Sequence, residues 1–413
     1  MRIAVFGLGY VGCVSAACLA RLGHTVLGID KDTFKVDLVN QGEAPFHEPE
    51  LSGILAQAVQ DGRLRASSSI GDELLETDAV IICVGTPSDP ASGKLDLSFL
   101  RRVSEEIARA PRPSSLIVCI RSTVFPGVNE QIHHEVFGYD PSIKMVSNPE
   151  FLREGSAVKD FLEPSLIVVG GEDRPAVDQI AGLYRDLPCE PQITNLRTAE
   201  MIKYACNAFH ALKIAFANEM GSLAHELGLD GGDVMQVLCR DTKLNVSAAY
   251  LRPGFAFGGS CLPKDLRALS YAAREASLRL PLLESVMPSN TEHLTRLVAR
   301  AQRLPAGRLG VFGLAFKENT DDLRESPIVQ LVELLLSQGR SLRIFDANID
   351  LTKIHGANQR YLLEHLPHIH RLMSSDFDQW SQWSEALIVA QKPNGQLQDR
   401  LLASGKSILD LTV

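Results

Sequence analysis

The sequence is poor in the features that mark several classes of protein. Lys and Arg total 41 against 50 Asp and Glu, a formal net charge of −9, and no run of basic residues occurs. Nucleic-acid-binding proteins normally carry a basic excess or a basic stripe, so no nucleic-acid partner is expected. The chain has no low-complexity tract or internal repeat, and its 31 Gly and 21 Pro among 413 residues are an ordinary share. This composition argues against a disordered, collagen-like or solenoid protein.

Cysteine is scarce as well. The chain has eight cysteines and none of them form a C-x-x-C spacing, which favours a reducing, cytoplasmic location and argues against structural zinc. His365, His368 and His370 imitate a metal cluster, but no Cys or carboxylate accompanies them at ligand spacing. We therefore expect no metal site.

Long apolar runs are nearly absent. Residues 3–20 carry no charge, but Gly7, Gly9 and Gly12 interrupt them, which is unlike a secretory signal peptide. No other stretch approaches the roughly 18 apolar residues that span a bilayer, so no membrane partner is expected.

What is present is an alternation of strand and helix patterns. Short apolar runs rich in Val and Ile predict buried strands of a parallel sheet, covered by helices on both faces. In the first half these runs are residues 2–6, 25–29, 79–84, 115–121, 144–147 and 165–169. A second set follows Pro305, with strands expected at 308–316, 342–345, 386–390 and 407–411 and a helix at 328–337.

The middle of the chain has a different pattern. A single long helix is expected over about residues 198–228, followed by helices at 226–238, 264–277 and 282–303. At about 150 residues per domain, the length predicts two or three domains. We expect an α/β fold with an N-terminal Rossmann-like domain (1–196), an all-helical connector with one long helix (197–303) and a smaller C-terminal Rossmann-like domain (304–413).

A dinucleotide-binding turn follows the first strand. Gly7, Gly9 and Gly12 form G-x-G-x-x-G where a helix begins, and Asp30 ends the second strand 18 residues after Gly12. The glycines allow a tight turn, close approach of a pyrophosphate and helix–strand packing, and the acid accepts a hydrogen bond from a ribose hydroxyl. This pattern favours NAD over NADP, although Lys31 and Lys35 lie nearby.

Two further loops leave expected strand ends. They carry Thr86, in Gly-Thr-Pro, and Thr123, in Ser-Thr-Val-Phe-Pro-Gly. Because ligands of open α/β sheets lie at the carboxyl ends of the strands, both threonines are expected to face the cofactor.

The long helix carries a polar border. Lys203, Asn207 and His210 fall at i, i+4 and i+7, beside an apolar stripe. They are either a solvated edge or a site in which Lys203 and Asn207 hold an oxygen that becomes negative during reaction.

One cysteine has an unusual setting. Cys261 follows two glycines and precedes Leu-Pro-Lys-Asp, where Pro263 suits the first turn of a helix. A thiol at a helix N-terminus beside Lys264 is expected to be partly thiolate and able to attack a carbonyl, although a structural role remains an equal alternative. The other seven cysteines are expected to be buried packing. NAD together with a nucleophilic cysteine points to oxidation of an alcohol through an aldehyde to an acid.

These motifs resemble those of the UDP-glucose/GDP-mannose dehydrogenase family over nearly the whole chain. They are FGLGYVG at 6–12, GTP at 85–87, NPEFLRE at 148–154, MIKYACN at 201–207, FGGSCLPKD at 257–265 and TDDLRESP at 320–327. Within the family, residues 207–210 and 250–258 are most similar to the branch that oxidises GDP-mannose to GDP-mannuronate, the alginate precursor, with two NAD per sugar.

The resemblance implies roles for individual residues. Cys261 would be the nucleophile, Lys203 and Asn207 would hold the reacting oxygen, Asp265 would support them, and Glu154 would handle water during thioester hydrolysis. The expected NAD contacts are Gly7, Gly9, Tyr10, Val11, Gly12, Asp30, Lys35, Thr86, Thr123, Lys264 and Arg324. The expected nucleotide-sugar contacts are Glu154, Lys203, Asn207, His210, Asn218, Tyr250, Arg252, Phe255, Gly258 and Lys317. The resemblance also implies a homodimer or higher homo-oligomer in which subunits exchange helical elements.

Alternatives remain open at this point. A UDP-glucose or other UDP-sugar 6-dehydrogenase would share the chemistry. A two-electron 3-hydroxyacid dehydrogenase would share the first domain and the Lys-x-x-x-Asn helix but would lack the cysteine and the second α/β domain. A non-enzymatic NAD-sensing protein would need no ordered set of thiol, lysine and asparagine.

Overall fold

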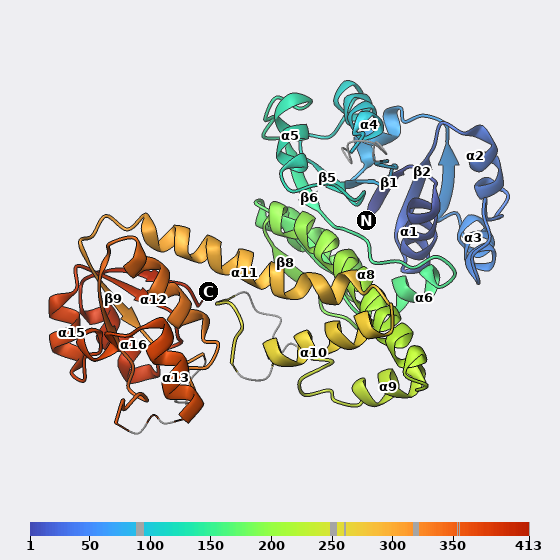
Figure 1. Ribbon diagram of the computed structural model, residues 1–413. Coiled ribbons are helices and arrows are strands. Elements are labelled where there is room, and N and C mark those ends of the chain that lie inside the picture. Colours follow the sequence, from blue (N-terminus) through green and yellow to red (C-terminus); the bar gives the residue numbers. More distant parts are fainter. Residues whose placement is uncertain are drawn as a thin grey trace. The chain divides into compact units, whose positions relative to one another are not determined.

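The computed structural model describes residues 1–87, 95–247, 254–259, 262–316, 322–352, 354 and 356–412, without the side chains of residues 264, 265, 268, 275, 356 and 357. The chain divides into two compact units, Met1–Ala211 and Leu212–Val413, which we describe separately (Figure 1). Within the described residues, no helix has the length and apolarity that crossing a bilayer requires.

The first unit is built on an eight-stranded sheet with the order β3-β2-β1-β4-β5-β6-β7-β8. Every neighbouring pair is parallel except β6–β7. The strands are β1 Arg2–Phe6, β2 Thr25–Ile29, β3 Leu64–Ser67, β4 Ala79–Ile82, β5 Leu116–Ile120, β6 Ile143–Ser147, β7 Val168–Gly171 and β8 Gln192–Thr194.

Helices cover both faces of this sheet, because consecutive strand residues point to opposite faces and both sets are apolar. On one face Ile3 and Val5 join the buried residues of α1, α3, α6 and α7, whereas on the other Ala4 and Phe6 join those of α4 and α5. The helices are α1 Tyr10–Arg21, α2 Thr33–Asn40, α3 Leu51–Gln60, α4 Ser98–Arg109, α5 Val128–Glu135, α6 Ala157–Leu162 and α7 Arg174–Ala181, with 3₁₀ turns Asp72–Glu76 and Gly182–Tyr184.

The expectation of an all-parallel sheet is wrong for the last two strands. The run expected at 165–169 forms β7 at Val168–Gly171, which pairs antiparallel with β6. A buried apolar run has the same composition in either direction, so its sequence predicts burial but not orientation. Strands β3 and β8, which are short, were not expected.

The long helix α8 spans Leu196–Glu226, two residues earlier than expected at both ends, and contributes residues to both units. Gly228, with φ of +71°, follows its end, as expected for a residue that terminates a helix.

The second unit contains a four-stranded parallel sheet with the order β10-β9-β11-β12. The strands are β9 Arg308–Phe312, β10 Ser341–Phe345, β11 Ala386–Val389 and β12 Ser407–Asp410. The helices are α9 Gly231–Leu238, α10 Leu262–Glu275, α11 Pro281–Gln302, α12 Pro327–Ser337, α13 Gly356–His365, α14 Ile369–Leu372, α15 Phe377–Trp383 and α16 Gly395–Ala403.

Strand β9 is shorter than the expected 308–316. Gly313 has φ of +92°, and a Cβ there would lie 2.4 Å from the Cβ of Gln391. The chain therefore turns at this glycine, which ends the strand. Leu309 and Val311 of β9 pack against α11 and α12, whereas Phe312 packs against Trp380 of α15 on the opposite face.

Candidate active site

The glycine-rich turn after β1 has the geometry of a dinucleotide site. Gly7 has φ of +92°, which L-residues rarely adopt, and a Cβ on Gly12 would lie 1.7 Å from the carbonyl oxygen of Gly7. By contrast, a Cβ on Gly9 would meet no atom of the described residues within 4 Å. Gly7 and Gly12 are therefore required by the turn itself, whereas the open space above Gly9 fits a group such as pyrophosphate that approaches the backbone.

Asp30 lies at the end of β2 beside this turn. Its Oδ2 accepts a hydrogen bond from the Leu8 N–H at 2.7 Å and lies 3.6 Å from Nζ of Lys35, and its Oδ1 accepts one from the Asp32 N–H at 2.9 Å. Gly7, Gly9, Asp30 and Lys35 border one cavity of about 320 Å³, whose wall includes Phe99 and Arg102 of α4. Four of the expected NAD contacts thus share one cavity of a size and chemistry that fit an adenosine moiety.

Tyr10 makes a contact that the sequence did not suggest. Its hydroxyl bonds to the Glu48 carboxylate and accepts a hydrogen bond from the Gly155 N–H at 2.8 Å. Burial, together with the Glu48 bond, raises the pKa of Tyr10 to about 12. Tyr10 therefore ties the start of α1 to the segment that carries Glu154, an exposed residue. Val11 is half-buried and packs against the core of the first unit.

The two expected threonine loops lie together at the carboxyl ends of β4 and β5. Thr86 Oγ1 donates a hydrogen bond to the Thr123 carbonyl at 2.6 Å, and Ser122 Oγ donates one to the Val84 carbonyl, also at 2.6 Å. Both threonines are half-buried. This is the edge of the sheet at which ligands of open α/β folds bind.

The polar border of α8 opens into a second cavity. Lys203, Asn207 and His210 line a space of about 450 Å³ together with Phe151 and Leu152 from the segment after β6. Asn207 and His210 are exposed, but Lys203 is only 7% exposed. The structure therefore brings the three expected residues of α8 to one cavity within the first unit.

Lys203 has an acidic partner that sequence reasoning missed. Its Nζ lies 2.8 Å from Oε1 of Glu150, whose side chain is 12% exposed, and 5.5 Å from the ring centre of Phe151. A buried ammonium with a carboxylate partner can hold or transfer a proton at an oxygen placed beside it. The available signal was an acid three residues after the β6 strand, in Asn-Pro-Glu, but that position alone does not distinguish Glu150 from Glu154.

The expectation of seven buried structural cysteines is partly wrong. Cys13, Cys18, Cys83 and Cys119 are buried, whereas Cys189 and Cys206 are half-buried and Cys239 is exposed, and all seven are free thiols. Cys206 also lines the cavity beside Lys203. The sequence pattern places Cys206 in the apolar stripe of α8, which predicted burial, but the side chain is half-buried at the border of the cavity.

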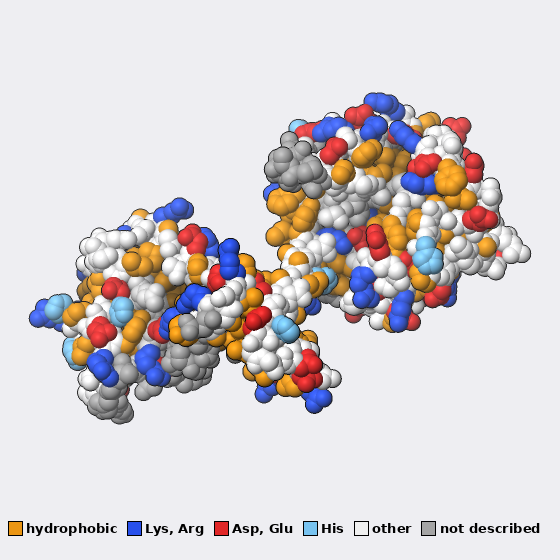
Figure 2. Space-filling view, turned by 45° about the vertical axis from the view of Figure 1, so that its right-hand side comes forward, with side chains coloured by type: hydrophobic (Ala, Val, Ile, Leu, Met, Phe, Trp, Pro, Cys, Tyr) orange, Lys and Arg blue, Asp and Glu red, His pale blue; other side chains and the backbone are white. Residues whose placement is uncertain are grey.

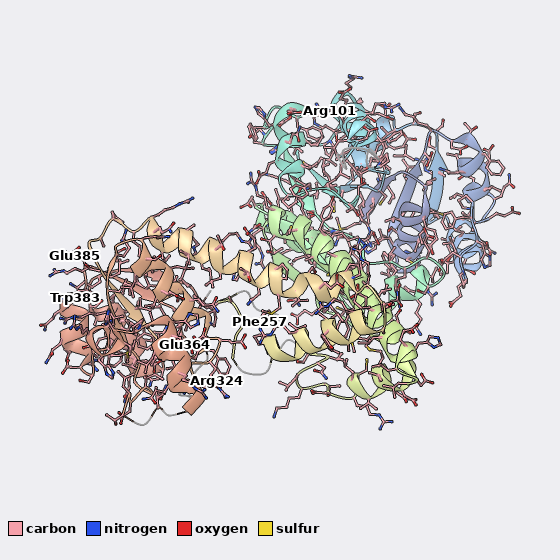
Figure 3. The ribbon with its side chains drawn as sticks, viewed as in Figure 1. Arg101, Phe257, Arg324, Glu364, Trp383 and Glu385 are labelled. Atoms are coloured by element: carbon pink, nitrogen blue, oxygen red, sulfur yellow. The ribbon has the colours of Figure 1, made fainter. Side chains whose placement is uncertain are left out.

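In the second unit, residues 254–259 lead toward Cys261. A Cβ on Gly258 would lie 2.3 Å from the carbonyl oxygen of Glu325, and Asn290 of α11 accepts the N–H of Phe257 at 3.0 Å and donates to its carbonyl at 2.8 Å. Phe255 packs against the core of this unit. The segment before the predicted nucleophile is therefore held from two sides, and Figure 3 marks Phe257 within it.

The other expected site residues of this unit are less informative. Asn218 is exposed on α8, and Arg324, marked in Figure 3, forms two hydrogen bonds to Asp322 at 2.8 and 2.9 Å. Lys264 and Asp265 belong to α10, but their side chains lie outside the described part of the chain. Tyr250, Arg252, Cys261 and Lys317 also lie outside the described residues.

The remaining surface features concern charge and metal-ligating side chains. The face drawn in Figure 2 shows Lys and Arg interspersed with Asp and Glu. Where side chains are described, no three His, Cys, Asp or Glu residues gather as metal ligands, and His365 bonds to Glu333 at 2.8 Å.

Models of one protein family match most of the chain, in three segments. Models of the UDP-glucose/GDP-mannose dehydrogenase family match residues 1–188 with the NAD binding domain, 197–292 with the central domain and 310–391 with the UDP binding domain.

Individual proteins are similar over most or all of the chain. The chain is 43% identical to GDP-mannose 6-dehydrogenase of Pseudomonas aeruginosa, over 100% of the chain and 96% of that protein. It is 38% identical to UDP-glucose 6-dehydrogenase of Rickettsia bellii, over 84% of the chain and 81% of that protein. A crystal structure of a ternary complex of the Pseudomonas aeruginosa GDP-mannose dehydrogenase superposes with a TM-score of 0.93, covering 100% of this chain and 96% of that one at 43% identity. The chain belongs to the UDP-glucose/GDP-mannose dehydrogenase family, whose members are NAD-dependent nucleotide-sugar dehydrogenases.

Proposed function

We propose that this chain oxidises the C6 alcohol of GDP-mannose to the carboxylate, giving GDP-mannuronate, a precursor of alginate-type polysaccharides. The observation that carries the proposal is the ion pair of the buried Lys203 with Glu150, beside Asn207 and in the same unit as the dinucleotide turn. The GDP-mannose 6-dehydrogenases that are 40–43% identical over the full chain support the choice of sugar.

The reaction is written as two oxidations and one hydrolysis. NAD, when bound, supplies the hydride acceptor. The C6 carbon first loses a hydride and its hydroxyl a proton, which gives an aldehyde. The thiolate of Cys261 then adds to this carbonyl carbon, and the oxygen takes a proton to give a thiohemiacetal. Loss of a second hydride from the same carbon, with a proton from the oxygen, gives a thioester. Water replaces the sulfur and returns Cys261 to its starting form, so one sugar, one water and two NAD⁺ yield a carboxylate, two NADH and three protons.

Each group of the first unit has a task in this scheme. Lys203 and Asn207 hold the C6 oxygen, which becomes negative when its proton leaves before hydride transfer and again when the thiolate adds to the carbonyl carbon, and an ammonium with an amide is suited to stabilise it. Glu150, at 2.8 Å from Lys203, accepts and returns a proton through that ammonium. Glu154 handles the water that cleaves the thioester. For Asp265, which belongs to the second unit, the family resemblance implies a supporting role for the lysine and asparagine.

The substrate and cofactor contacts follow the family resemblance. His210, Asn218, Tyr250, Arg252, Phe255, Gly258 and Lys317 hold the nucleotide sugar. Gly7, Gly9, Tyr10, Val11, Gly12, Asp30, Lys35, Thr86, Thr123, Lys264 and Arg324 contact NAD. The proposed division is 1–196 for NAD, 197–303 for the helical connector and 304–413 for the nucleotide sugar.

Assembly and location complete the proposal. Ile214, Leu227, Leu229 and Val237 are each more than half exposed on α8, on α9 and between them, a pattern that supports burial of these helices between subunits of a homo-oligomer with exchanged elements. A reducing, cytoplasmic location fits a chain whose seven described cysteines are all free.

The test is the amount of NADH formed per sugar. We expect two NADH per GDP-mannose, a higher kcat/KM for GDP-mannose than for UDP-glucose, and no complete turnover by Cys261→Ser. One NADH per sugar with accumulating aldehyde, or full turnover by Cys261→Ser, contradicts the thioester route. A clear advantage of UDP-glucose contradicts the choice of sugar and leaves the chemistry intact.

A further inference from the structure

Three segments of the first unit meet around Lys203. They are the loop at residues 121–127 that follows β5, the segment at 148–154 that follows β6, and the first turns of α8. The first carries Thr123, the second Glu150 and Glu154, and the third Lys203 and Asn207. Arg121, Glu200 and Lys203 are buried charged residues that each join two of these segments. Their three contacts form a closed ring.

Arg121 joins the first two segments. It is 5% exposed, and its Nη1 donates to Oδ1 of Asn148 at 2.8 Å and to the hydroxyl of Tyr184 at 3.1 Å, while its Nε donates to Oγ of Ser15 at 3.1 Å. All of these acceptors are neutral, and among the described residues no carboxylate lies within ion-pair distance of Arg121. A guanidinium is costly to bury in this way, so an arginine here implies a role that a neutral residue would not fill.

Glu200 joins the third segment to the first. It is 2% exposed, and its carboxylate accepts hydrogen bonds from the Gly127 N–H at 2.6 Å, from the Asn129 N–H at 2.9 Å and from Nδ2 of Asn129 at 2.8 Å. These donors lie where the loop ends and α5 begins. Glu200 precedes Lys203 by three residues, so both side chains leave neighbouring positions on one side of α8.

Lys203 closes the ring through its contact with Glu150. Thr123 lies inside the loop that Arg121 holds at its beginning and Glu200 holds at its end. The distances between Thr123, Glu150 and Lys203 therefore depend on both buried charges. We propose that Arg121 and Glu200 are positioning residues, which act through Asn148 and through α5 to fix Lys203 and Asn207 relative to the reacting carbon. This inference rests on the proposed function of Lys203 and Asn207.

Activity is expected to respond strongly to this ring, because displacement of a catalytic group by about 1 Å can reduce the rate by a factor on the order of 100. A contact that only held α8 against α5 would not change the rate in this way. The chain offers a matched control, because an exposed ion pair between Arg197 and Glu130 joins the same two helices, α8 and α5. Their side chains are 65% and 41% exposed, so this pair is expected to contribute little.

The experiment compares Glu200→Gln, Arg121→Lys and the control Arg197→Ala in the full-length enzyme. Glu200→Gln keeps the shape of the side chain, but its NH₂ group would face one of the N–H groups that now donate to the carboxylate. Arg121→Lys keeps the charge but loses the planar set of N–H donors of the guanidinium. We expect both to lower kcat by about 10- to 100-fold. We expect KM for NAD to change less than kcat does, because Thr123 is one of several NAD contacts, and Arg197→Ala to stay within about twofold in every parameter.

Two further measurements separate positioning from folding. Circular dichroism and NAD binding give the fraction of each variant that is folded and able to bind the cofactor. The measured kcat is divided by this fraction. In the double variant Glu200→Gln/Arg121→Lys, kcat is expected to fall no more than about twofold below the worse single variant, because either change opens the same ring.

The outcomes are distinct. Normalised kcat values equal to that of Arg197→Ala, or a double variant whose loss equals the product of the single losses, overturn the positioning role. Full turnover by Cys261→Ser contradicts the proposed function instead, whatever the ring variants do.

Discussion

At the scale of single residues, Gly12 and Gly9 of the glycine-rich turn are required for different reasons, which the G-x-G-x-x-G motif alone does not distinguish. The structure itself requires Gly12, since a Cβ would lie 1.7 Å from the Gly7 carbonyl oxygen, a backbone atom that cannot move aside. Gly9 has free space, so its requirement comes from the ligand alone. The motif predicted both glycines but not this difference, because the spacing does not state which atoms lie above each Cα.

This difference gives a prediction for two alanine variants. Gly12→Ala is expected to lower the free energy of unfolding by about 3 kcal/mol or more, because backbone must shift. Gly9→Ala is expected to change it by less than about 1 kcal/mol, yet to weaken NAD binding at least about tenfold. Denaturant unfolding and calorimetric titration with NAD measure the two quantities.

Each variant is the control for the other. A Gly12→Ala protein as stable as the wild type would show that α1 can move away from β1 at low cost. Wild-type NAD affinity in Gly9→Ala would show that the pyrophosphate does not approach this turn.

That Lys203 and Asn207 share one cavity was predictable from the sequence, whereas the contact of Glu150 with Lys203 was not. The first two lie on one long helix, whose period of 3.6 residues fixes which side chains share a face. Glu150 belongs to an irregular segment, where no period relates sequence position to direction. The same limit applies to Arg121 and Glu200, whose roles depend on contacts over 27 and 71 residues of sequence separation.

At the scale of elements, the strands were predictable where they are central and fully apolar. Strands β1, β2 and β4 form within runs that the sequence predicted to within a residue or two, and they pair with one another in the sheet. Strand β3, with alternating burial at the sheet edge, and the three-residue β8 give too short a pattern to be distinguished from a loop. The reversed direction of β7 depends on how the chain connects β6 to β7, which composition does not record.

One buried carboxylate joins several elements. Glu48, in the loop between α2 and α3, is 6% exposed and accepts hydrogen bonds from Tyr10 of α1, from Gly155 at 2.9 Å and from Ala157 of α6 at 2.7 Å. Burial opposes its ionisation, but these bonds outweigh that effect and lower the pKa of Glu48 below its ordinary value of 4.5. Glu48 thus fixes the segment that carries Glu154 against the start of α1.

We predict a pH-dependent cost for Glu48→Gln. A carboxylate whose folded pKa is lowered stabilises the protein above its unfolded pKa and loses this contribution as the pH falls through the folded value. The variant is therefore expected to be about 1–3 kcal/mol less stable near neutral pH. This difference is expected to shrink below pH 4.5.

Chemical denaturation of wild type and Glu48→Gln at several pH values measures this dependence. Asp61→Asn, at an exposed carboxylate that accepts a bond only from Gln57 among the described residues, is the matched control and is expected to show no such change. A stability difference that is constant from pH 7 to the acid range would contradict the assigned role of the Glu48 charge.

At the scale of the whole molecule, the two units have the same layered architecture, with sheets of different size. Each has a sheet whose apolar faces are both covered by helices, and α8 contributes residues to both units. Composition and alternation were sufficient to predict this α/β organisation, because they depend on local periodicity. The faces of α8 and α9 that remain exposed could not be predicted in this way, since an apolar stripe has the same pattern whether its cover comes from the same chain or from another.

The exposed apolar residues of these helices give the last prediction. Ile214 on α8 and Val237 on α9 are 63% and 65% exposed and belong, with Leu227 and Leu229, to a set of exposed apolar side chains along these consecutive helices, whereas a single exposed apolar side chain is ordinary. We predict that the protein is a homodimer or larger oligomer and that Ile214→Glu/Val237→Glu shifts it toward the monomer, because buried carboxylates would lack partners. Light scattering after gel filtration measures the mass. The control Leu402→Glu, at a leucine of α16 that is 68% exposed, is expected to leave the mass unchanged. A wild-type protein that is monomeric at micromolar concentration, or an oligomer that both variants leave intact, would show that these two side chains are not part of a subunit interface.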